Sequence, residues 1–516
     1  MRRGFVLLSC ERSHDLMIVA AILYAIATTA LGLYGVYVLA LVAQCLRYRR
    51  APGLPLPKAP VMQDAHDLPA ITVQLPLYNE PYVAGRIVDA AAALDWPRHL
   101  LHIQVLDDST DDTTAIARAR VEAYRRRGID MALIHRSTRA GYKAGALANG
   151  LTSARGEYVA IFDADFVPAP DFLKRLMPHF AAGASIGFVQ ARWEHLNYRR
   201  SALARALAIA VDGHFVVEQF ARSRSGWPVI FNGSAGIWRR LCIEDSGGWH
   251  DDTLCEDMDL SFRAMLAGWR GVFVPEVVAP QEEPESIGAL KLQHARWAKG
   301  GAQCLRKHAV SILRASSWSP AQKAAGFAYF AGYTAHLFMV LVVLLWLPLA
   351  MHAPSLQQGP LAFFGLSGLG LPMAYVVAQW ALHRHDGSWL RRLSYLPLLL
   401  VVGFGVAFSN ALAVLSGLMR RGGEFHRTPK GAPDTTRLAD SRPRAELLAW
   451  LEMGMALYAA AAGLALWITG HPTTSAFVAI FALGFGSVGI GSLIEIARVR
   501  GNAPARGAQR RRRAAL

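Results

Sequence analysis

Cysteine is scarce in this sequence, and the spacing of the few that occur argues against two kinds of scaffold. Only five of the 516 residues are cysteine, and no two of them form a C-x-x-C pair: Cys10, Cys45, Cys242, Cys255 and Cys304. A disulfide framework or a cysteine-ligated zinc site needs cysteines in closely spaced sets. The chain is therefore expected to fold without either, as is usual for a domain in the reducing cytoplasm.

Charged residues are also few, at 18% of the chain, whereas 53% is hydrophobic. The apolar residues gather into stretches that approach or exceed the roughly 20 residues needed to cross a bilayer. Five such stretches predict five membrane spans, at 16–46, 325–351, 360–383, 446–469 and 474–497. The first is too long for a signal-peptide core and has no clear cleavage site, so we interpret it as a retained helix.

A sixth apolar stretch, 393–419, is flanked by basic residues on both sides. If it crossed the membrane, the basic residues of 420–442 would lie outside, against the tendency of such residues to stay in the cytoplasm. We therefore predict a re-entrant or in-plane segment. The net charge of +16 is concentrated beside apolar segments, which favours contacts with anionic lipid over nucleic-acid binding; a solvated tail and linkers are the alternative.

The remaining sequence predicts an α/β domain. Strands are expected at 71–75, 101–106, 132–135, 158–162 and 186–190, with helical patterns between them, such as 113–127, 143–153 and 170–180. Alternation of this kind gives a mainly parallel sheet covered by helices, with ligands at the carboxyl ends of its strands. The predicted organisation is a helix at 1–50, a linker at 51–69, the α/β domain at 70–284, interface helices at 285–322, a membrane region at 323–498 that includes a loop at 420–445, and a basic tail at 499–516.

The strongest local feature is a pair of carboxylates, Asp163 and Asp165, directly after the apolar strand at 158–162. On extended backbone, side chains two residues apart project on the same side. Two oxygen ligands at a sheet edge suit Mg²⁺ or Mn²⁺ bound to a diphosphate. The alternative is a turn in which one aspartate caps the next helix.

Polar residues also end two other predicted strands. Asp107 and Asp108 follow the strand at 101–106, and Asn79 and Glu80 follow the strand at 71–75. Hydrogen bonding to a nucleoside would explain them, although Asp108 and Asn79 could also cap helices. Lys143 stands near the start of a predicted helix, where amides and positive charge favour phosphate.

Two later helices carry candidate catalytic groups. Glu256, Asp257 and Asp259 open a helical stretch, where a carboxylate can act as a general base, although Glu256 and Asp259 could be capping residues. Gln293, Arg296 and Trp297 share one face of the following helix. The arginine could pair with a pyrophosphate and the tryptophan could stack on a sugar, and the helix could equally lie on a membrane surface.

Taken in order, Asp107-Asp108, Asp163-Ala-Asp165, Glu256-Asp257 and Gln293-x-x-Arg-Trp297 resemble the motifs of the cellulose-synthase-like inverting glycosyltransferases. Further segments resemble the mannan and glucomannan synthase branch of that family: Gln104-Val-Leu-Asp-Asp-Ser-Thr110, Gly141-Tyr-Lys-Ala-Gly-Ala-Leu147, Val189-Gln-Ala-Arg-Trp193 and Phe231-Asn-Gly-Ser-Ala-Gly-Ile-Trp238. The resemblance covers about 70–310 and implies a cytoplasmic GT-A domain, a Rossmann-like α/β fold, joined to membrane helices.

The resemblance also implies roles for particular residues. Asp257 would be the catalytic base. The donor would be bound by Asp107, Asp108, Lys143, Asp163, Gln293, Arg296 and Trp297, and Asp163 and Asp165 would hold the metal. The acceptor would contact Asn232, Gly233, Ser234, Glu256 and Trp297, and Phe425, Thr428 and Lys430 would belong to a gating-like loop. Cys255 stands where the family usually has threonine, which puts a role for that hydroxyl in doubt.

The function predicted from these features is transfer of a hexose from a UDP-glucose or GDP-mannose type donor to a growing β-linked polysaccharide. Trp193, Trp238 and Trp297 could bind successive sugar rings, or they could simply fill the core. Transfer of one sugar to a membrane lipid is the first alternative, and a transporter with a degenerate domain is the second. The expected location is a bacterial-type inner or plasma membrane, with the catalytic domain in the cytoplasm.

Overall fold

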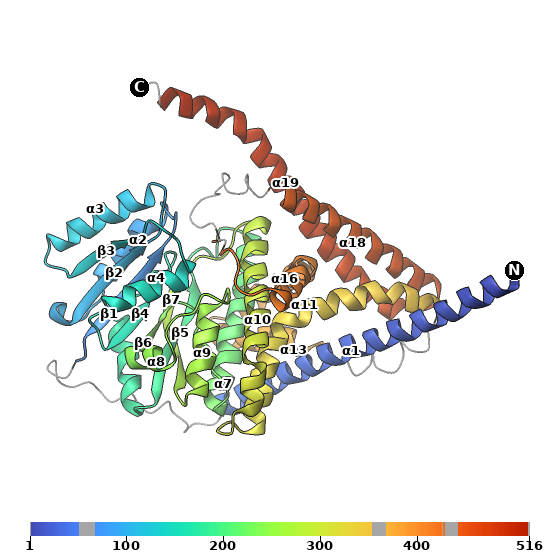
Figure 1. Cartoon of the computed structure of the whole chain (residues 1–516), viewed down its shortest axis with the longest axis horizontal. Coiled ribbons are helices and arrows are strands. Elements are labelled where there is room, and N and C mark those ends of the chain that lie inside the picture. The colour runs from blue at the N-terminus through green and yellow to red at the C-terminus, as the bar shows by residue number, and fades with distance from the viewer. Residues whose placement is uncertain (1, 51–67, 353–367, 426, 429–441, 514–516) are drawn as a thin grey trace.

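The computed structural model describes residues 2–50, 68–352, 368–425, 427–428 and 442–513. Its centre is a seven-stranded sheet in the order β3-β2-β1-β4-β6-β5-β7, which Figure 1 shows on the side of the molecule away from the N-terminus. The strands are β1 (Ile71–Leu77), β2 (Leu101–Asp107), β3 (Met131–His135), β4 (Tyr158–Ile161), β5 (Ile186–His195), β6 (Gly236–Arg239) and β7 (Arg270–Gln281).

Helices cover both faces of this sheet, and its central strands are buried on both sides. Every residue of β1, β2 and β4 is buried, as expected for parallel strands between two helical layers. One face packs against α2 (Ala84–Ala92), α3 (Thr113–Arg125) and α5 (Phe172–Leu176). The other packs against α4 (Tyr142–Thr152), α7 (Phe220–Ser225), α8 (Arg240–Asp245) and the end of α1 (Arg2–Arg50).

Strand β6 is the exception to the parallel arrangement, since it pairs antiparallel with both β4 and β5. Its first residue, Gly236, is level with Ile161 at the end of β4. The residues before a reversed strand therefore lie at the same sheet edge as the residues after its parallel neighbours. This places the segment 232–234 beside Asp163.

Most remaining helices follow the α/β domain. Between β5 and β6 lie α6 (Ala202–Gly213) and the π-helix η4 (His214–Gln219), and α9 (Glu256–Leu266) precedes β7. The short turns η2 (Arg98–Leu100) and η3 (Met177–Ala182) flank β2 and α5. After β7 come α10 (Ile287–Arg314), α11 (Pro320–His352), α13 (Gly370–His383), α14 (Trp389–Leu393), α15 (Leu396–Gly405), α16 (Ala407–Met419), α18 (Arg442–Ile468) and α19 (Pro472–Arg513).

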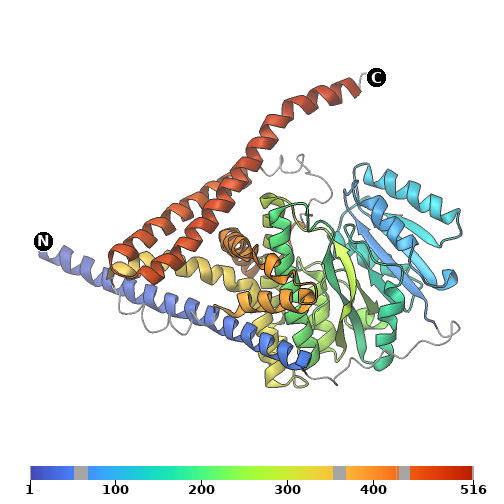
Figure 2. The same ribbon diagram turned by 180° about the vertical axis from the view of Figure 1, so that it is seen from behind.

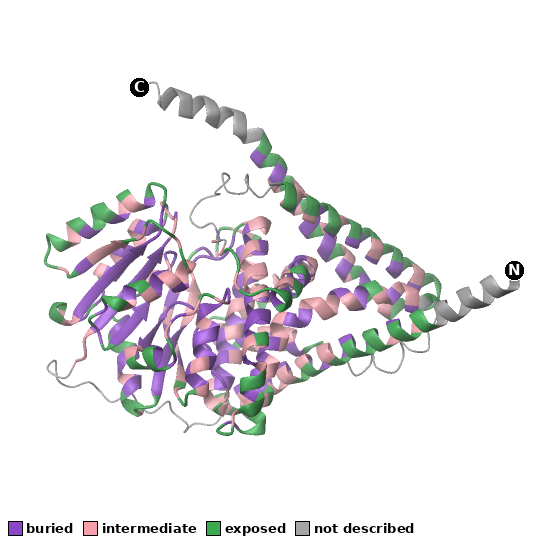
Figure 3. Ribbon diagram, viewed as in Figure 1, coloured by how far each residue is buried: buried purple, intermediate pink, exposed green. Residues whose placement is uncertain are grey.

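Four helices in the described part of the chain are long and apolar enough to cross a membrane: Asp15–Arg49, Pro320–Leu349, Pro443–Ile468 and Pro472–Arg500. They extend away from the sheet, as both ribbon views show (Figure 1, Figure 2). Their outer surfaces are largely exposed, in contrast to the buried sheet (Figure 3). Exposed apolar side chains along such helices, for example Leu16, Leu457 and Leu483, indicate association with a lipid membrane.

These four helices coincide with four of the five predicted spans. The fifth prediction, 360–383, falls partly outside the described residues, and the helix seen there, α13, has only 14 residues. The segment 393–419 is broken, with a 45° bend between Trp389–Gly405 and Ala407–Met419. Residues 51–67 of the predicted linker and Lys430 lie outside the described residues. The helix α19 continues through 499–513, where the sequence predicted a separate tail.

The five predicted strands and the GT-A class of fold are confirmed, with shifts of a few residues at strand ends. β6 and β7 were not predicted. β6 is a short strand placed between helices, and β7 contains two prolines, Pro275 and Pro280, which weaken a strand signal in sequence.

Candidate active site

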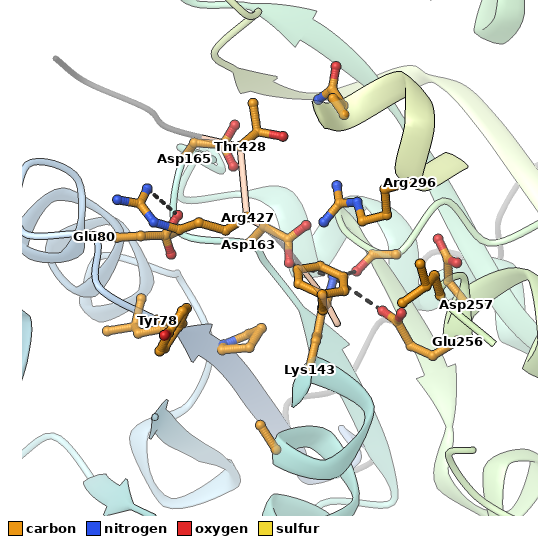
Figure 4. Close-up of a pocket in the computed structure, with 18 of the residues that line it drawn as sticks. Tyr78, Glu80, Lys143, Asp163, Asp165, Glu256, Asp257, Arg296, Arg427 and Thr428 are labelled. Carbon is orange, nitrogen blue, oxygen red and sulfur yellow. Dashed lines mark hydrogen bonds and ion pairs between the residues drawn. The ribbon is translucent and has the colours of Figure 1, made fainter. Parts of the chain in front are cut away.

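A pocket lies at the carboxyl edge of the sheet, where β1, β2 and β4 end. Its walls include these strand ends, the start of α4, the segment before β6, the start of α9, one face of α10, and residues 425, 427 and 428. Figure 4 shows Lys143 near its centre, with Glu256 and Asp257 on one side and Glu80 and Arg427 on the other. Residues separated by almost 350 positions in sequence therefore share one cavity.

Lys143 links the two acidic sides of this pocket. Its Nζ lies 2.6 Å from Asp163 Oδ1 and 3.7 Å from Glu256 Oε1, and it donates to the Gly233 carbonyl at 2.9 Å. Burial opposes the ammonium charge, but the carboxylates of Asp163 and Glu256 outweigh it and raise the pKa of Lys143 to about 12. The pocket therefore holds a permanent cation between the aspartate pair and α9.

Asp163 and Asp165 both line the pocket, but not in the way the sequence predicted. β4 ends at Ile161 and a turn follows, so the two carboxylates are not on extended backbone. Asp163 is about one-third exposed and pairs with Lys143, whereas Asp165 is buried. Ser234 is buried and accepts a hydrogen bond from the Asp163 backbone N–H at 2.9 Å, so it positions the aspartate turn and does not line the pocket.

Glu80 faces this aspartate pair from the end of β1. Burial raises the pKa of its carboxyl to about 7, and the negative charges of Asp165 and Asp163 add to the rise. Arg427, from the loop after α16, opposes it with Nη1 at 3.6 Å from Glu80 Oε1. The Arg427 side chain is 9% exposed, so this part of the loop closes one wall of the pocket.

The neighbouring aspartates after β2 differ from each other. Asp107 is fully buried, and its oxygens accept from Ser109 N and Thr114 Oγ1 and contact His135 Nδ1, all within 3.0 Å. It holds the turn together and does not line the pocket. Asp108 does line it, fixed by a bidentate contact from Arg136 at 2.7 and 2.5 Å.

The start of α9 brings a second carboxylate pair into the pocket. Asp257 Oδ1 accepts from the Met258 backbone N–H at 2.8 Å. Burial raises the pKa of the Asp257 carboxyl to about 7, and the Glu256 charge contributes in the same direction. A carboxylate with a pKa near neutrality is suited to accept a proton at physiological pH. Neither Glu256 nor Asp257 acts as an N-cap, since the cap position is Cys255.

Asp259, two residues later, points away from the pocket and into a cluster of cations. Its oxygens lie 2.8 Å from His308 Nε2, Lys307 Nζ and Arg263 Nη2. It therefore fastens α9 to α10, and the capping alternative for Asp259 is replaced by this ion-pair cluster.

Asn232 and Gly233 form the wall beside Lys143. The Asn232 side chain is held by the π-helix η4, with Gln219 Nε2 at 2.7 Å and His214 Nε2 at 3.0 Å. Gly233 has φ +81°, and a Cβ at this position would lie 2.8 Å from Asp257 Oδ2. Glycine is thus required here both by the backbone and by the neighbouring carboxylate.

The helix α10 supplies Gln293, Arg296 and Trp297 to the pocket, as predicted from their shared face. The Arg296 guanidinium lies over the Phe425 ring at 4.3 Å, and Phe425 O accepts from Arg139 Nη2 at 3.0 Å. Thr428 is buried in the same wall, and its hydroxyl has no hydrogen-bond partner among the described residues. An open buried donor beside Arg296 suits an anionic ligand.

Two sets of residues could be considered for a metal ion. His250, Asp252 and Asp259 lie close enough together, but Lys307 already pairs with Asp252 and Asp259, which leaves little need for a cation. Asp163 and Asp165 fit better, because both line the pocket beside Glu80, and the negative charges of Asp165 and Asp163 contribute to the raised pKa of the Glu80 carboxyl. Hard oxygen ligands of this kind suit Mg²⁺ or Mn²⁺.

The comparisons with known proteins agree with this geometry. Residues 69–300 match the family model described as "Glycosyltransferase like family 2". Glucomannan 4-beta-mannosyltransferase 7 of Arabidopsis thaliana is 33% identical over 445 residues, which cover 82% of this chain and 77% of that protein. This chain belongs to the family 2 glycosyltransferases, in the glucomannan mannosyltransferase-like branch.

Other relatives of this family 2 glycosyltransferase align over a shorter segment. The probable glucomannan 4-beta-mannosyltransferase 7 of Oryza sativa subsp. japonica is 41% identical over 273 residues, or 52% of this chain and 47% of that protein. The match thus spans about half the length of several curated relatives. The mannosyltransferase PcManGT of Pyrobaculum calidifontis, solved with GDP-Man and Mn²⁺, has 23% identity and a TM-score of 0.48 over 70% of this chain and 99% of its own.

Several pocket residues of the glycosyltransferase were not predicted as site residues. Arg139 and Arg427 line the pocket, but isolated arginines in loops carry no recognisable spacing. Glu80 was noted in the sequence as a polar residue after the strand at 71–75, but it was not assigned to the donor, acceptor or metal site. Trp238, predicted near the acceptor, is fully buried against Phe188 and Phe231, so for this residue the core alternative was right. Trp193 and Trp297 do line the pocket.

Proposed function

We propose that this protein is a membrane-embedded, inverting hexosyltransferase that passes a sugar from a nucleotide-sugar donor of the GDP-mannose or UDP-glucose type to a growing β-linked polysaccharide. The observation that carries the proposal is the placement of Asp257 across a single cavity from Asp163 and Asp165, with Lys143 between them. A base and a diphosphate-binding edge are thereby held on opposite sides of one sugar-sized space. A mannan-type product is proposed because the curated relatives are named glucomannan 4-beta-mannosyltransferases.

In the proposed reaction, the Asp257 carboxylate accepts the proton of the acceptor hydroxyl. The oxygen of that hydroxyl forms a bond to the anomeric carbon as the bond to the nucleoside diphosphate breaks, which inverts the configuration. Lys143 and Arg296 stabilise the negative charge that develops on the leaving group. Asn232 and Trp193 lie on the acceptor side of the base.

The residues proposed to hold Mg²⁺ or Mn²⁺ are Asp163 and Asp165. When bound, the metal would neutralise charge on the diphosphate. Asp165→Ala is expected to abolish both transfer and stimulation by divalent ions, because one remaining carboxylate holds Mg²⁺ poorly. Full activity of the wild-type protein in excess chelator would show that the reaction does not need this metal.

The test of the function is a donor screen with the full-length protein in lipid nanodiscs. Released nucleoside diphosphate is measured, and the product is sized and digested with linkage-specific β-hydrolases. Asp257→Asn should reduce transfer by about 10²–10⁴-fold while donor binding is retained, and Asp130→Asn, which alters an exposed ion pair with Arg155, should behave as wild type. A monoglycosylated lipid as the sole product would contradict polymer synthesis, and near wild-type turnover of Asp257→Asn would contradict the assigned base.

The proposed location is a bacterial-type inner or plasma membrane, with the catalytic domain and the segment 420–445 on the cytoplasmic side. Arg421 is exposed after α16, and Thr469 is exposed between α18 and α19. In a cysteine-free background, an impermeant thiol reagent should label Thr469→Cys in intact cells and Arg421→Cys only in opened membranes. Labelling of Arg421→Cys in intact cells would show that 393–419 crosses the membrane.

A further inference from the structure

Gln303 lies two turns beyond the Gln293-Arg296-Trp297 face on α10, and only 1% of it is exposed. Its side-chain amide is fully used. Oε1 accepts from the Leu254 backbone N–H at 2.9 Å, and Nε2 donates to the carbonyl oxygens of Arg420 and Gly422 at 3.1 and 2.7 Å. A glutamine in the middle of a helix needs no such partners for the helix itself, so these contacts serve the segments that it joins.

The two segments joined by Gln303 are the ones that complete the pocket from opposite sides. Leu254 stands three residues before the base Asp257, and Leu254, Cys255 and Glu256 all line the cavity. Gly422 stands three residues before Phe425, which covers Arg296.

A second contact joins the same two segments directly, without a residue of α10. The Gly422 N–H donates to Asp252 O at 2.7 Å. One amide side chain and one backbone bond thus hold 252–254 and 420–422 side by side on α10. The segments also pack closely against α10. A Cβ at Gly300 would lie 2.3 Å from Cys255 Sγ, and one at Gly417 would lie 2.4 Å from Lys299 O.

We propose that Gln303 is a positioning residue that fixes the spacing between the base-bearing start of α9 and the loop over the donor side of the pocket. The inference rests on the proposed function for its catalytic consequence, but the tether itself is a structural claim. Loss of the bonds to Arg420 and Gly422 frees the loop that covers Arg296. Loss of the bond to Leu254 loosens the segment that leads into Asp257.

Two substitutions separate these effects. Gln303→Glu retains an acceptor for Leu254 N–H but places a carboxylate against two carbonyl oxygens, so it displaces the loop alone. Gln303→Met has a similar shape and retains none of the three bonds. We expect Gln303→Glu to raise the donor KM about tenfold with a smaller change in kcat, and Gln303→Met to lower kcat about tenfold as well, as is typical when a buried hydrogen bond is removed.

The matched control is Arg306→Met on the same helix. Arg306 Nη1 donates to Leu418 O at 3.0 Å, so this variant removes a contact to the end of α16 without touching Leu254 or Gly422. It should retain wild-type kcat and KM.

A readout that does not depend on activity is tryptic cleavage after Arg420 and Arg421, measured beside the thermal midpoint of each variant in nanodiscs. Cleavage should be faster in both Gln303 variants than in the wild type and the control. Cleavage of both Gln303 variants at the wild-type rate would overturn the proposal. So would a loss of activity that is explained entirely by a smaller folded fraction of the variant protein. Gln303→Asn, whose amide is one methylene shorter, replaces Gln303→Met if that variant does not fold. If the wild type transfers no sugar from any donor, the proposed function fails and the cleavage rates still decide the tether.

Discussion

Among single residues, Lys143 determines the character of the pocket. It contacts Asp163, Glu256 and the Gly233 carbonyl, so one ammonium group balances charge on both the donor and the base side. A buried cation of this kind would be costly without its carboxylates. When a diphosphate arrives, its charge would be stabilised by a group that is already ionised and in place.

The protonation state of Asp257 sets a pH dependence with a definite sign. Burial raises the pKa of this carboxyl to about 7, with Glu256 adding to the rise. Only the deprotonated form accepts a proton, so turnover at saturating donor should fall as the pH decreases through about 7. The measurement is kcat across pH about 5.5 to 9.

Glu80 provides the control for this pH dependence, because burial also raises its pKa to about 7. In Glu80→Gln the titration of that residue is removed, and the fall of kcat at low pH should remain. If kcat of the wild type does not fall at low pH, Asp257 does not control the profile. The same conclusion follows if the fall of kcat is absent in Glu80→Gln.

Gly233 offers a test of the pocket's geometry with a matched control in the same chain. Gly233 and Gly226 both have positive φ, +81° and +67°, so alanine at either position should cost about 1–2 kcal/mol of folding free energy. The added Cβ meets Asp257 at Gly233, whereas nothing lies within 4 Å of it at Gly226.

Both glycine variants should therefore lose a similar amount of thermal stability, and only Gly233→Ala should lose transfer activity. Equal activity in the two folded variants would show that the space beside Asp257 is not used in the reaction.

At the scale of elements, the parallel strands could be predicted from sequence and the reversed strand could not. Buried strands such as Ile71–Leu77 are rich in apolar and β-branched residues, and the polar residues after them signal the ligand edge. β6 has only four residues, and the Asn232-Gly233 turn signal before it does not show in which direction the strand runs. For the same reason the prediction of Asn232 as an acceptor contact came only from motif resemblance.

The two α9 aspartates show the same limit within the site. Spacing along a helix placed Asp257 and Asp259 on different faces of the helix. It could not show which residues contact the face that carries Asp259. Lys307 and His308 come from α10, about 50 residues later, and such long-range ion pairs leave no pattern in sequence. The loop residues Arg139 and Arg427 were missed for this reason too.

The α9 cluster predicts that Asp259→Asn acts on stability rather than chemistry. His308 and the cations Lys307 and Arg263 hold the pKa of the Asp259 carboxyl well below its usual range despite its burial. Removing its charge takes away the buried carboxylate that Arg263 and His308 contact and leaves Lys307 with Asp252 alone, which should cost about 3–5 kcal/mol.

The expected result is a lower thermal midpoint for Asp259→Asn, with activity per folded molecule close to wild type. Asp252→Asn, on the exposed side of the same cluster, should cost much less. A folded Asp259→Asn protein with no activity would instead place this residue in the reaction.

At the scale of the whole molecule, α10 connects the pocket to the membrane helices. Lys291 Nζ lies 2.8 Å from Glu452 Oε1 of α18, and the Glu452 side chain is fully buried. Lys291→Met leaves that carboxylate unpaired and should destabilise the protein by about 3–5 kcal/mol.

The double variant Lys291→Met/Glu452→Met removes both charges and should recover most of this loss. Thermal unfolding of the two single variants and the double variant in nanodiscs measures the coupling. Additive losses would show that the two groups do not interact.

The first turn of α10 is completed by the last helix of the chain. The backbone N–H groups of Ile287 and Gly288 donate to Glu495 of α19 at 2.7 and 2.8 Å, about 200 residues downstream. During synthesis, the helix that carries Arg296 and Trp297 thus has two open amides until α19 has been made and has docked. Assembly of the pocket is thereby tied to completion of the membrane region, so a ribosome-bound chain that ends before residue 472 would hold Arg296 and Trp297 on an unfinished helix.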